Sequence, residues 1–348
     1  MISVLQLFKI IFGVIISAFV LIIILNFALS YTNVGESSRD VEVLISLKKA
    51  IDDVYVTGIP TDFDINLEDV VGFYRPPNLV TSVSAVSLDP IPAFFVPGKE
   101  ISIHRNEYDI GWWKFQFIEA VPEMKIIFVP LGTKEVVWKT AENITKYFPS
   151  TENTKTKVLF GVGCNDTGGK NVFFFLNWER DYLIKTVLPW LHEEGYEFDP
   201  CGRKEGYRML TITETPVDAD FQVVPIDGEM GYVYMNDTQH GQGTYLYKTP
   251  LDIIALFFGG EDMYEYENGK FLNDLSIASD LASREASLLR GKMNPSCDTP
   301  YSRFVQVLGH LKNIADNGDY RNEDDMRELN RNIRNSVEIY KEMEEMGC

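Results

Sequence analysis

Residues 161–171, GVGCNDTGGKN, form a glycine-rich segment directly after the apolar run at residues 158–160. Such a segment can cradle a phosphate, present a reactive cysteine or form a surface loop. A phosphate-binding loop needs GxxxxGK followed by Ser or Thr and then a helix. Here Cys164 stands where the first glycine belongs, Asn171 replaces the hydroxyl residue, and the following VFFFL is typical of a strand. The spacing therefore argues against a nucleotide site.

A nucleophilic cysteine would require a nearby base, and no histidine lies at a spacing that supports a pair with Cys164. The chain contains no CxxC, GxSxG or HExxH motif. Its histidines are scattered: His104, His192, His240 and His310. The segment HGQG at residues 240–243 is therefore interpreted as a surface turn rather than a catalytic loop.

Carboxylates offer a third kind of chemistry, because their oxygen atoms bind calcium. Two acidic pairs stand out, Asp218 with Asp220 and Glu261 with Asp262, but neither approaches the spacing of an EF-hand loop. We predict no catalytic residue, no cofactor and no metal site, and the sequence leans against an enzyme.

The composition limits the partners. Of 348 residues, 51 are acidic and 32 are basic, which gives a net charge of −19, and no run of lysine or arginine breaks the pattern. This charge repels nucleic acid, which is therefore not an expected partner. With 45% hydrophobic residues the chain can bury a sizeable core, and its length favours two compact units or one large one.

The strongest pattern lies near the N-terminus. Residues 10–25, IIFGVIISAFVLIIIL, carry no charge, and the apolar stretch continues to Leu29. At about 1.5 Å per residue, a helix over residues 10–29 is long enough to cross a hydrocarbon core of about 30 Å. A cleaved signal peptide is the alternative, because Ala28 and Ser30 are small residues of the kind that a signal peptidase needs. The apolar region of a signal peptide, however, is usually about 7–15 residues long, which is shorter than the run at residues 10–29. We expect an uncleaved anchor in the lipid bilayer.

The flanking charges set the orientation of this anchor. Lys9 and the amino terminus precede the span, whereas Glu36, Asp40 and Glu42 follow it. Positive charge favours the cytoplasmic side. We expect a single-pass protein of the cell membrane, with residues 1–9 in the cytoplasm and the bulk of the chain extracytoplasmic.

The four cysteines all follow the predicted span: Cys164, Cys201, Cys297 and Cys348. An even number in an oxidising compartment predicts two disulfide bonds. Of three connectivities we favour Cys164 with Cys201 and Cys297 with Cys348, the second because two antiparallel helices would carry both cysteines to one end. Counted from Asp319, Cys348 would lie about 10 Å farther along its helix than Cys297 does along the preceding one. This exceeds the roughly 7 Å between Cα atoms that a disulfide allows, so an earlier helix end must bring the two cysteines together. Free, buried cysteines are the alternative.

Three N-glycosylation sequons begin at Asn143, Asn165 and Asn236. Each is predicted to lie in a loop on the outer side, which makes the chain a candidate glycoprotein.

The pattern of apolar residues predicts a change of structure along the chain. Residues 38–55 have helical periodicity, and proline-separated β-branched runs such as KEISIH, WWKFQFI and KIIFVP fill residues 58–131. The odd-numbered aromatic residues of WWKFQFI, Trp113, Phe115 and Phe117, should form a core stripe. Strands and helices alternate from residue 133 to about 260, and helices dominate thereafter.

We therefore predict an α+β, multidomain chain. It comprises a cytoplasmic tail (1–9), a transmembrane helix (10–30), a stalk helix (31–56), a β-rich, sandwich-like domain (57–132), a mixed α/β domain (133–260) and a C-terminal helical hairpin (261–348).

Two segments carry a resemblance to a known class of proteins. LQLFKIIFGVIISAFVLIIIL and TPLDIIALFFGGEDMYEYENGKFLNDLSIASDLASREASLL, together with the order of the parts, resemble uncharacterised archaeal-type, single-span, extracytoplasmic surface proteins. The resemblance implies membrane anchoring and carries no assigned activity. The apolar helix also looks like that of a pilin, but no processing site of Lys or Arg followed by Gly precedes it.

Our leading hypothesis is a membrane-anchored, extracytoplasmic binding or structural protein of the cell envelope, with an envelope protein or a second copy of the chain as partner. An exposed apolar patch on the α/β or helical section would favour it. The alternatives are an ectoenzyme acting on envelope glycans or peptides, which predicts converging carboxylates of perturbed pKa in a deep pocket, and a pilin-like assembly subunit.

Overall fold

The computed structural model describes residues 42–64, 71–74, 77–80, 85–87, 93–95, 100–122, 125–131, 134–147, 157–162, 173–176, 208–215, 221–228, 230–237, 241–292 and 294–348. Within these ranges the chain is a mixed α+β structure with a seven-stranded, a four-stranded and a three-stranded sheet. The predicted α+β class is confirmed.

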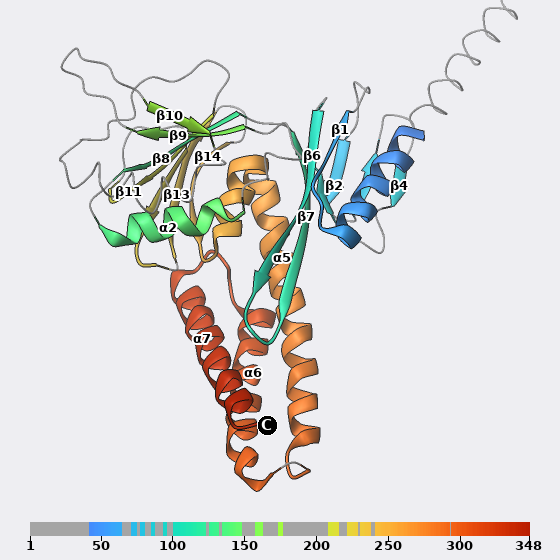
Figure 1. The fold of residues 1–348 in the computed structure, drawn as a ribbon, viewed down its shortest axis with the longest axis vertical. Helices are drawn as coiled ribbons and strands as arrows, with labels where there is room; N and C mark the ends of the chain where they lie inside the picture. Colours follow the sequence, from blue (N-terminus) through green and yellow to red (C-terminus); the bar gives the residue numbers. More distant parts are fainter. Residues whose placement is uncertain are drawn as a thin grey trace, which may run out of the picture.

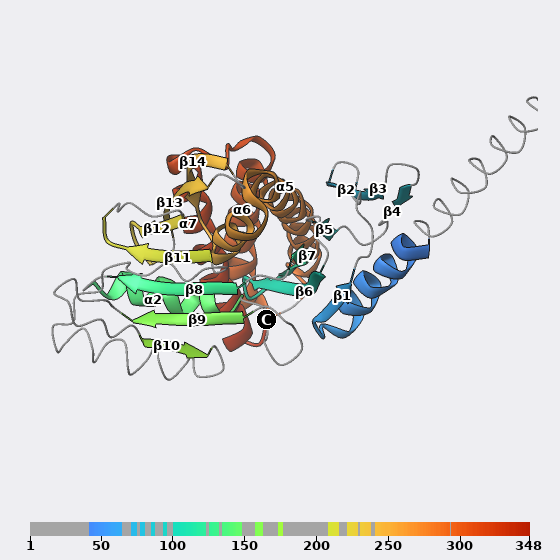
Figure 2. The same cartoon turned by 90° about the horizontal axis from the view of Figure 1, so that it is seen from above.

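The seven-stranded sheet has the order β10-β9-β8-β11-β12-β13-β14. Its strands are β8 (Lys125–Leu131), β9 (Lys157–Val162), β10 (Phe173–Leu176), β11 (Arg208–Thr213), β12 (Phe221–Pro225), β13 (Gly231–Asp237) and β14 (Gly241–Tyr247). Four neighbouring strands, β9, β8, β11 and β12, are parallel. Antiparallel strands extend the sheet at both edges, β10 beside β9 and β13 with β14 beyond β12. Figures 1 and 2 show this sheet at one end of the molecule, with α2 (Glu135–Thr145) packed against it.

One buried core joins this sheet to two helices. Alternate residues of β11 and β12, such as Leu210, Ile212 and Phe221, pack with Val137 and Ile144 of α2. The apolar run IIALFF at residues 253–258 belongs to the same core and lies in α5 (Pro250–Leu289). An uninterrupted apolar run predicts an element buried on all sides, and these six residues are indeed fully buried.

The four-stranded sheet has the order β1-β6-β7-β5. Its strands are β1 (Thr61–Asp64), β5 (Ala93–Phe95), β6 (Glu100–Asp109) and β7 (Lys114–Pro122), and the small sheet contains β2 (Val71–Tyr74), β3 (Pro77–Val80) and β4 (Ala85–Ser87). The helix at residues 42–57 packs Leu44, Leu47 and Ile51 against Ile101 and Ile103 of β6. The helix predicted over residues 38–55 is therefore present over described residues 42–57, and it packs on a sheet.

Strands β6 and β7 form a long antiparallel ribbon between two helical layers (Figure 1). On one face lies the helix at residues 42–57. On the other face, Phe115 lies with its ring centroid 4.9 Å from that of Phe271 in α5, and the indole N–H of Trp112 donates to the hydroxyl of Ser336 at 2.8 Å. Phe115 and Phe117 are buried, as the predicted core stripe requires, whereas Trp113 is 37% exposed.

The C-terminal part of the chain is helical. Helix α5 contains a break at Gly260, whose φ of +69° lies in the region that favours glycine, so the segments at residues 250–259 and 261–289 run in different directions. A short 3₁₀ helix, η3 (Pro295–Cys297), leads into α6 (Asp298–Asn317), and α7 (Glu323–Glu345) follows. We call the second segment of α5, together with α6 and α7, the arm; it projects from the sheets (Figure 1).

The arm is closed by the disulfide bond between Cys297 and Cys348, whose Cα atoms are 5.7 Å apart. The pairing expected from the sequence is present, and two features remove the expected mismatch in length. Helix α7 begins at Glu323, four residues after Asp319, from which the lengths were counted. After its end the chain turns back at Gly347, with φ of +69°, so that the amide of Cys348 donates to the carbonyl of Met343. Cys164 and Cys201 lie outside the described residues.

Several predicted boundaries differ from the structure. The run KIIFVP, predicted to belong to the β-rich section, forms β8 and pairs with β9 and β11 of the seven-stranded sheet. The last helical section begins at Pro250 rather than near residue 261, and in it α5 precedes the neighbouring helices α6 and α7. Residues 177–207 of the predicted α/β section lie outside the described residues.

Within the described ranges, no helix combines the length and apolar character that a membrane crossing requires. The predicted span at residues 10–29 lies outside those ranges.

Replacing both Cys297 and Cys348 by serine should lower the free energy of unfolding by about 2–4 kcal/mol, because the bond constrains the unfolded chain across 51 residues. Urea denaturation of the full chain in detergent, followed by far-UV circular dichroism, measures the loss. Equal unfolding midpoints for the variant and the parent would contradict a stabilising role for this bond.

Candidate functional site

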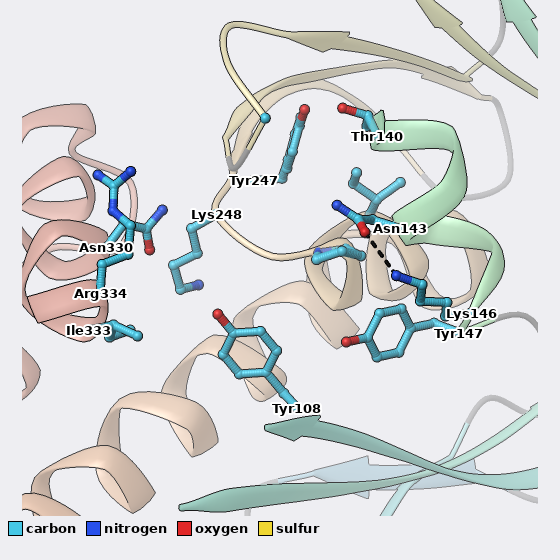
Figure 3. Close-up of a pocket in the computed structure, with 13 residues that line it drawn as sticks. Tyr108, Thr140, Asn143, Lys146, Tyr147, Tyr247, Lys248, Asn330, Ile333 and Arg334 are labelled. Atoms are coloured by element: carbon cyan, nitrogen blue, oxygen red, sulfur yellow. Dashed lines mark hydrogen bonds between the residues drawn. The ribbon is translucent and has the colours of Figure 1, made fainter. Parts of the chain in front are cut away.

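A cavity of about 250 Å³ lies where the two larger sheets meet the arm, and we call it the junction pocket (Figure 3). Its walls come from the C-terminal half of α2, the link from β14 to α5, one face of α7 and the side chain of Tyr108 on β6. Its polar lining residues are Tyr108, Thr140, Asn143, Lys146, Tyr147, Tyr247, Lys248, Asn330 and Arg334. Three of these are basic, and the described lining contains no carboxylate, imidazole or thiol.

Helix α2 presents Asn143, Lys146 and Tyr147 to the pocket at its C-terminal end. The start of this helix is fixed by Glu214, which follows β11: its carboxylate accepts the backbone N–H of Lys134 at 2.7 Å and lies 3.5 Å from the ammonium of Lys134. A carboxylate at a helix N-terminus offsets the unpaired N–H groups and the helix dipole. The ammonium of Lys146 lies 3.2 Å from the amide oxygen of Asn143 (Figure 3).

Lys248 is held by a buried group that we call the Asp252 cluster: Lys248, Thr249, Asp252 and Asn268. The carboxylate of Asp252 accepts the backbone N–H groups of Lys248 and Thr249, each at 2.9 Å, and the amide of Asn268 at 3.0 Å. The ammonium of Lys248 lies 3.2 Å from the same carboxylate and also donates to the amide oxygen of Asn268. Thr249 and Asp252 form a capping box at the start of α5.

Helix α7 contributes Asn330, Ile333 and Arg334, which lie on one face because they are three and four residues apart. Asn330 is 8% exposed, and its amide nitrogen has no hydrogen-bond partner in the described structure. A buried amide donor without an acceptor costs about 1–3 kcal/mol. This arrangement favours a ligand that supplies an acceptor.

The tyrosines of the pocket act as neutral donors. Burial raises the pKa of the Tyr147 and Tyr247 hydroxyls above the usual value, so both keep their protons at neutral pH. Figure 3 shows the hydroxyls of Tyr108 and Tyr147 directed toward the space that the ammonium of Lys248 also faces, while the Tyr247 hydroxyl lies beside that of Thr140. The pocket therefore offers N–H and O–H donors from several directions.

A second polar group lies nearby, sealed between the ribbon and α5. Glu119 on β7 accepts the amide of Asn106 at 2.9 Å, and its carboxylate lies 2.7 Å from Nε2 of His104, its cross-strand partner on β6. Glu267 of α5 packs against Glu119, and both are buried. These are the converging carboxylates that an ectoenzyme predicts, but they line the core rather than the junction pocket.

Burial raises the pKa of Glu267 well above its usual 4.5, and the negative charges of Glu119 and Asp252 raise it further, whereas Lys270 opposes the rise. The folded chain therefore keeps a proton on Glu267 that the unfolded chain releases as the pH rises through about 4.5. Because the folded state binds more protons, the stability contributed by this group is greatest below pH 4.5 and declines toward higher pH.

Replacing Glu267 with glutamine should remove this decline, because the amide keeps the shape of the protonated acid and cannot ionise. We expect the free energy of unfolding of Glu267→Gln, relative to the parent, to increase from pH 4 to pH 8 in urea titrations of the full chain. Glu285→Gln, on an exposed part of the same helix, is the matched control and should show no such trend. A difference between Glu267→Gln and the parent that is constant with pH would contradict the raised pKa of Glu267.

The residues singled out from the sequence do not converge on the pocket, with one exception. Asn143 lines it, but lies in helix α2 rather than in a loop, and Asn236 lies in strand β13, so the predicted loop positions are wrong for both. Asn165 and residues 163–171 of its glycine-rich segment lie outside the described residues. The flanking β9 and β10 pair as antiparallel strands, in agreement with the argument against a phosphate-binding loop. Glycosylation of the three asparagines stays a prediction.

Two other predicted features have different outcomes. Residues 241–243 of HGQG form part of β14 and pair with β13, so the surface-turn interpretation is wrong for them. Glu261 lies 3.4 Å from the guanidinium of Arg321, which makes it part of a surface ion pair. Among the described residues, no group of three or more His, Cys, Asp or Glu side chains is placed to hold a metal ion. Asp218 and Asp220 lie outside the described ranges.

The sequence contains a partial signal for Glu119 and Asp252, two buried carboxylates that were not among the predicted site residues. Phe115, Phe117 and Glu119 alternate along β7, so the strand pattern places a carboxylate on the same buried face as two aromatic rings. The capping box at Thr249 and Asp252 is likewise visible as TPLD. Neither pattern indicates the contact between Asp252 and Asn268 or the presence of the junction pocket. The contact and the pocket both depend on the bend at Gly260.

Comparison with known proteins finds no match: no family model, no curated protein and no solved structure is similar to this chain. A function for this chain can therefore be inferred only from its own sequence and structure.

Proposed function

We propose that this chain is a membrane-anchored, extracytoplasmic binding protein of the cell envelope, and that the junction pocket is its ligand site. The observation that carries the binding role is the pocket lining, which combines three basic side chains, a buried amide donor without an acceptor and neutral hydroxyls. Such a lining holds and orients a ligand. Its described residues include no carboxylate, imidazole or thiol, so a binding role accounts for the pocket better than an ectoenzyme does.

Two observations support the extracytoplasmic placement. The apolar run at residues 10–29 has the length of a membrane span, with Lys9 before it and acidic residues after it. The Cys297–Cys348 disulfide is of the kind that persists in oxidising compartments. In this proposal, the helix at residues 42–57 follows the membrane anchor, and the sheets and the arm lie outside the cell.

An apolar stripe on the arm supports a partner in the envelope. Ile277, Leu281 and Leu288 are 52%, 51% and 64% exposed, and their spacings of four and seven residues place them on one face of α5. An exposed apolar stripe of this kind is typical of a protein contact. The partner is an envelope protein or a second copy of the chain.

Membrane anchoring predicts that the full chain resists extraction by alkaline carbonate. Placing arginines in the centre of the span, as Val20→Arg with Ile23→Arg, should release the chain from the membrane, because each costs about 2.5–3.5 kcal/mol at the centre of a bilayer. Ile45→Arg, at an exposed position outside the span, is the control and should leave extraction unchanged. Intact-mass measurement decides whether the chain begins at Met1.

Extraction of the parent by carbonate would contradict the anchor. Protease added to intact cells should digest the chain beyond Tyr31 but not residues 1–9, and full protection would contradict the orientation. Free thiols at Cys297 and Cys348 in protein isolated without reductant would contradict an oxidising compartment.

A further inference from the structure

The junction pocket differs in charge from the rest of the molecule. The chain has a net charge of −19, yet the described lining contains Lys146, Lys248 and Arg334 and no acidic residue. These cations come from three separate elements: the end of α2, the link before α5 and α7. A local excess of positive charge in a strongly acidic protein selects negatively charged ligands from solution.

The three cations contribute in different ways. The charge of Lys248 is offset by Asp252, so this residue acts chiefly as a fixed hydrogen-bond donor and as a wall of the pocket. Lys146 is exposed, and its ammonium contacts the neutral amide oxygen of Asn143, so its positive charge acts on the pocket and on approaching anions. Arg334 adds a guanidinium on the opposite side (Figure 3).

Neutral donors complete the site. The amide nitrogen of Asn330 is buried and has no partner among the described residues, and it lies between Arg334 and Lys248 (Figure 3). The hydroxyls of Tyr108 and Tyr147 reach the same space from the other side. An oxyanion with several terminal oxygens could accept hydrogen bonds that converge from these directions and would be attracted by the exposed ammonium of Lys146, whereas a neutral sugar would gain nothing from that charge.

We propose that the junction pocket binds the phosphate group of a small phosphomonoester, such as a sugar phosphate. A phosphomonoester presents three terminal oxygens and close to two negative charges at neutral pH. A cavity of about 250 Å³ is slightly smaller than the roughly 300–1,000 Å³ typical of drug-sized ligands, which suits a single ring with one phosphate. The rings of Tyr108 and Tyr147, with Pro250 and Ile253, supply walls for the uncharged part. This inference rests on the proposed role of the pocket in binding.

The phosphate group could come from a soluble metabolite or from a lipid head group. The test is isothermal titration calorimetry on the full chain in a non-ionic, phosphate-free detergent solution. The titrants are glucose 6-phosphate, inorganic phosphate, glucuronate, glucose and glycerophosphoglycerol, the diester of a lipid head group. We expect glucose 6-phosphate to bind with a dissociation constant below about 1 mM and at least tenfold more tightly than glucose, glucuronate and the diester.

Two substitutions test the assigned donors. Lys146→Gln removes an exposed charge with little risk to folding, and Asn330→Asp replaces the buried donor by a carboxylate of the same shape. Each should weaken binding of glucose 6-phosphate by about tenfold or more, since each alters a hydrogen bond or a charge at the anion. Lys139→Gln is the matched control, because Lys139 also lies on α2 but does not line the pocket. Its ammonium lies 2.9 Å from the carboxylate of Glu135. It should change binding less than twofold.

The outcomes separate the inference from the proposed function. If glucose or glucuronate binds as tightly as glucose 6-phosphate and Lys146→Gln has no effect, the phosphate assignment is overturned while a binding pocket stands. If the diester binds most tightly, the ligand is a lipid head group and the monoester assignment fails. If no titrant binds a chain whose circular dichroism and disulfide are intact, both the phosphate assignment and the binding role of this pocket are overturned.

Discussion

The buried carboxylate of Asp252 is the constraint on which the arrangement of the described structure depends. A charge removed from water is stable only when donors surround it, and this one accepts two backbone N–H groups and the amide of Asn268 and lies 3.2 Å from the ammonium of Lys248. These donors belong to the link after β14 and to the far segment of α5. The cluster therefore fixes the angle between the seven-stranded sheet and the arm, and the bend at Gly260 lets both segments reach it.

The same cluster separates two kinds of electrostatic environment. On its inner side, Glu119 and Glu267 are enclosed by the ribbon and α5, where burial and the neighbouring negative charges raise the pKa of Glu267. On its outer side, Lys248 contributes to a pocket whose other cations come from α2 and α7. Acidic and basic groups are thus divided between core and cavity, with Asp252 and Lys248 at the boundary.

Local patterns in the sequence predict much of the secondary structure, and contacts between distant residues explain where the prediction is wrong. Asn322 followed by three acidic residues is a pattern typical of a helix start, and the side chain of Asn322 caps α7. Gly241 and Gly243 suggest a turn, but pairing with β13 imposes a strand. The apolar run at residues 253–258 has no clear periodicity, and a helix buried on all sides leaves none to detect. The junction pocket draws on residues from Tyr108 to Arg334, which no local pattern relates.

The bend at Gly260 gives the arm the properties of a lever. The segment at residues 261–289 spans roughly 40 Å as a helix, and the Asp252 cluster lies near its upper end. A rotation of about 5° at that end would displace the far end by roughly 4 Å. The disulfide ties the start of α6 to the end of α7, so a rotation of the arm would move these helices together. A small change in geometry beside the pocket would thus be several times larger at the tip of the arm.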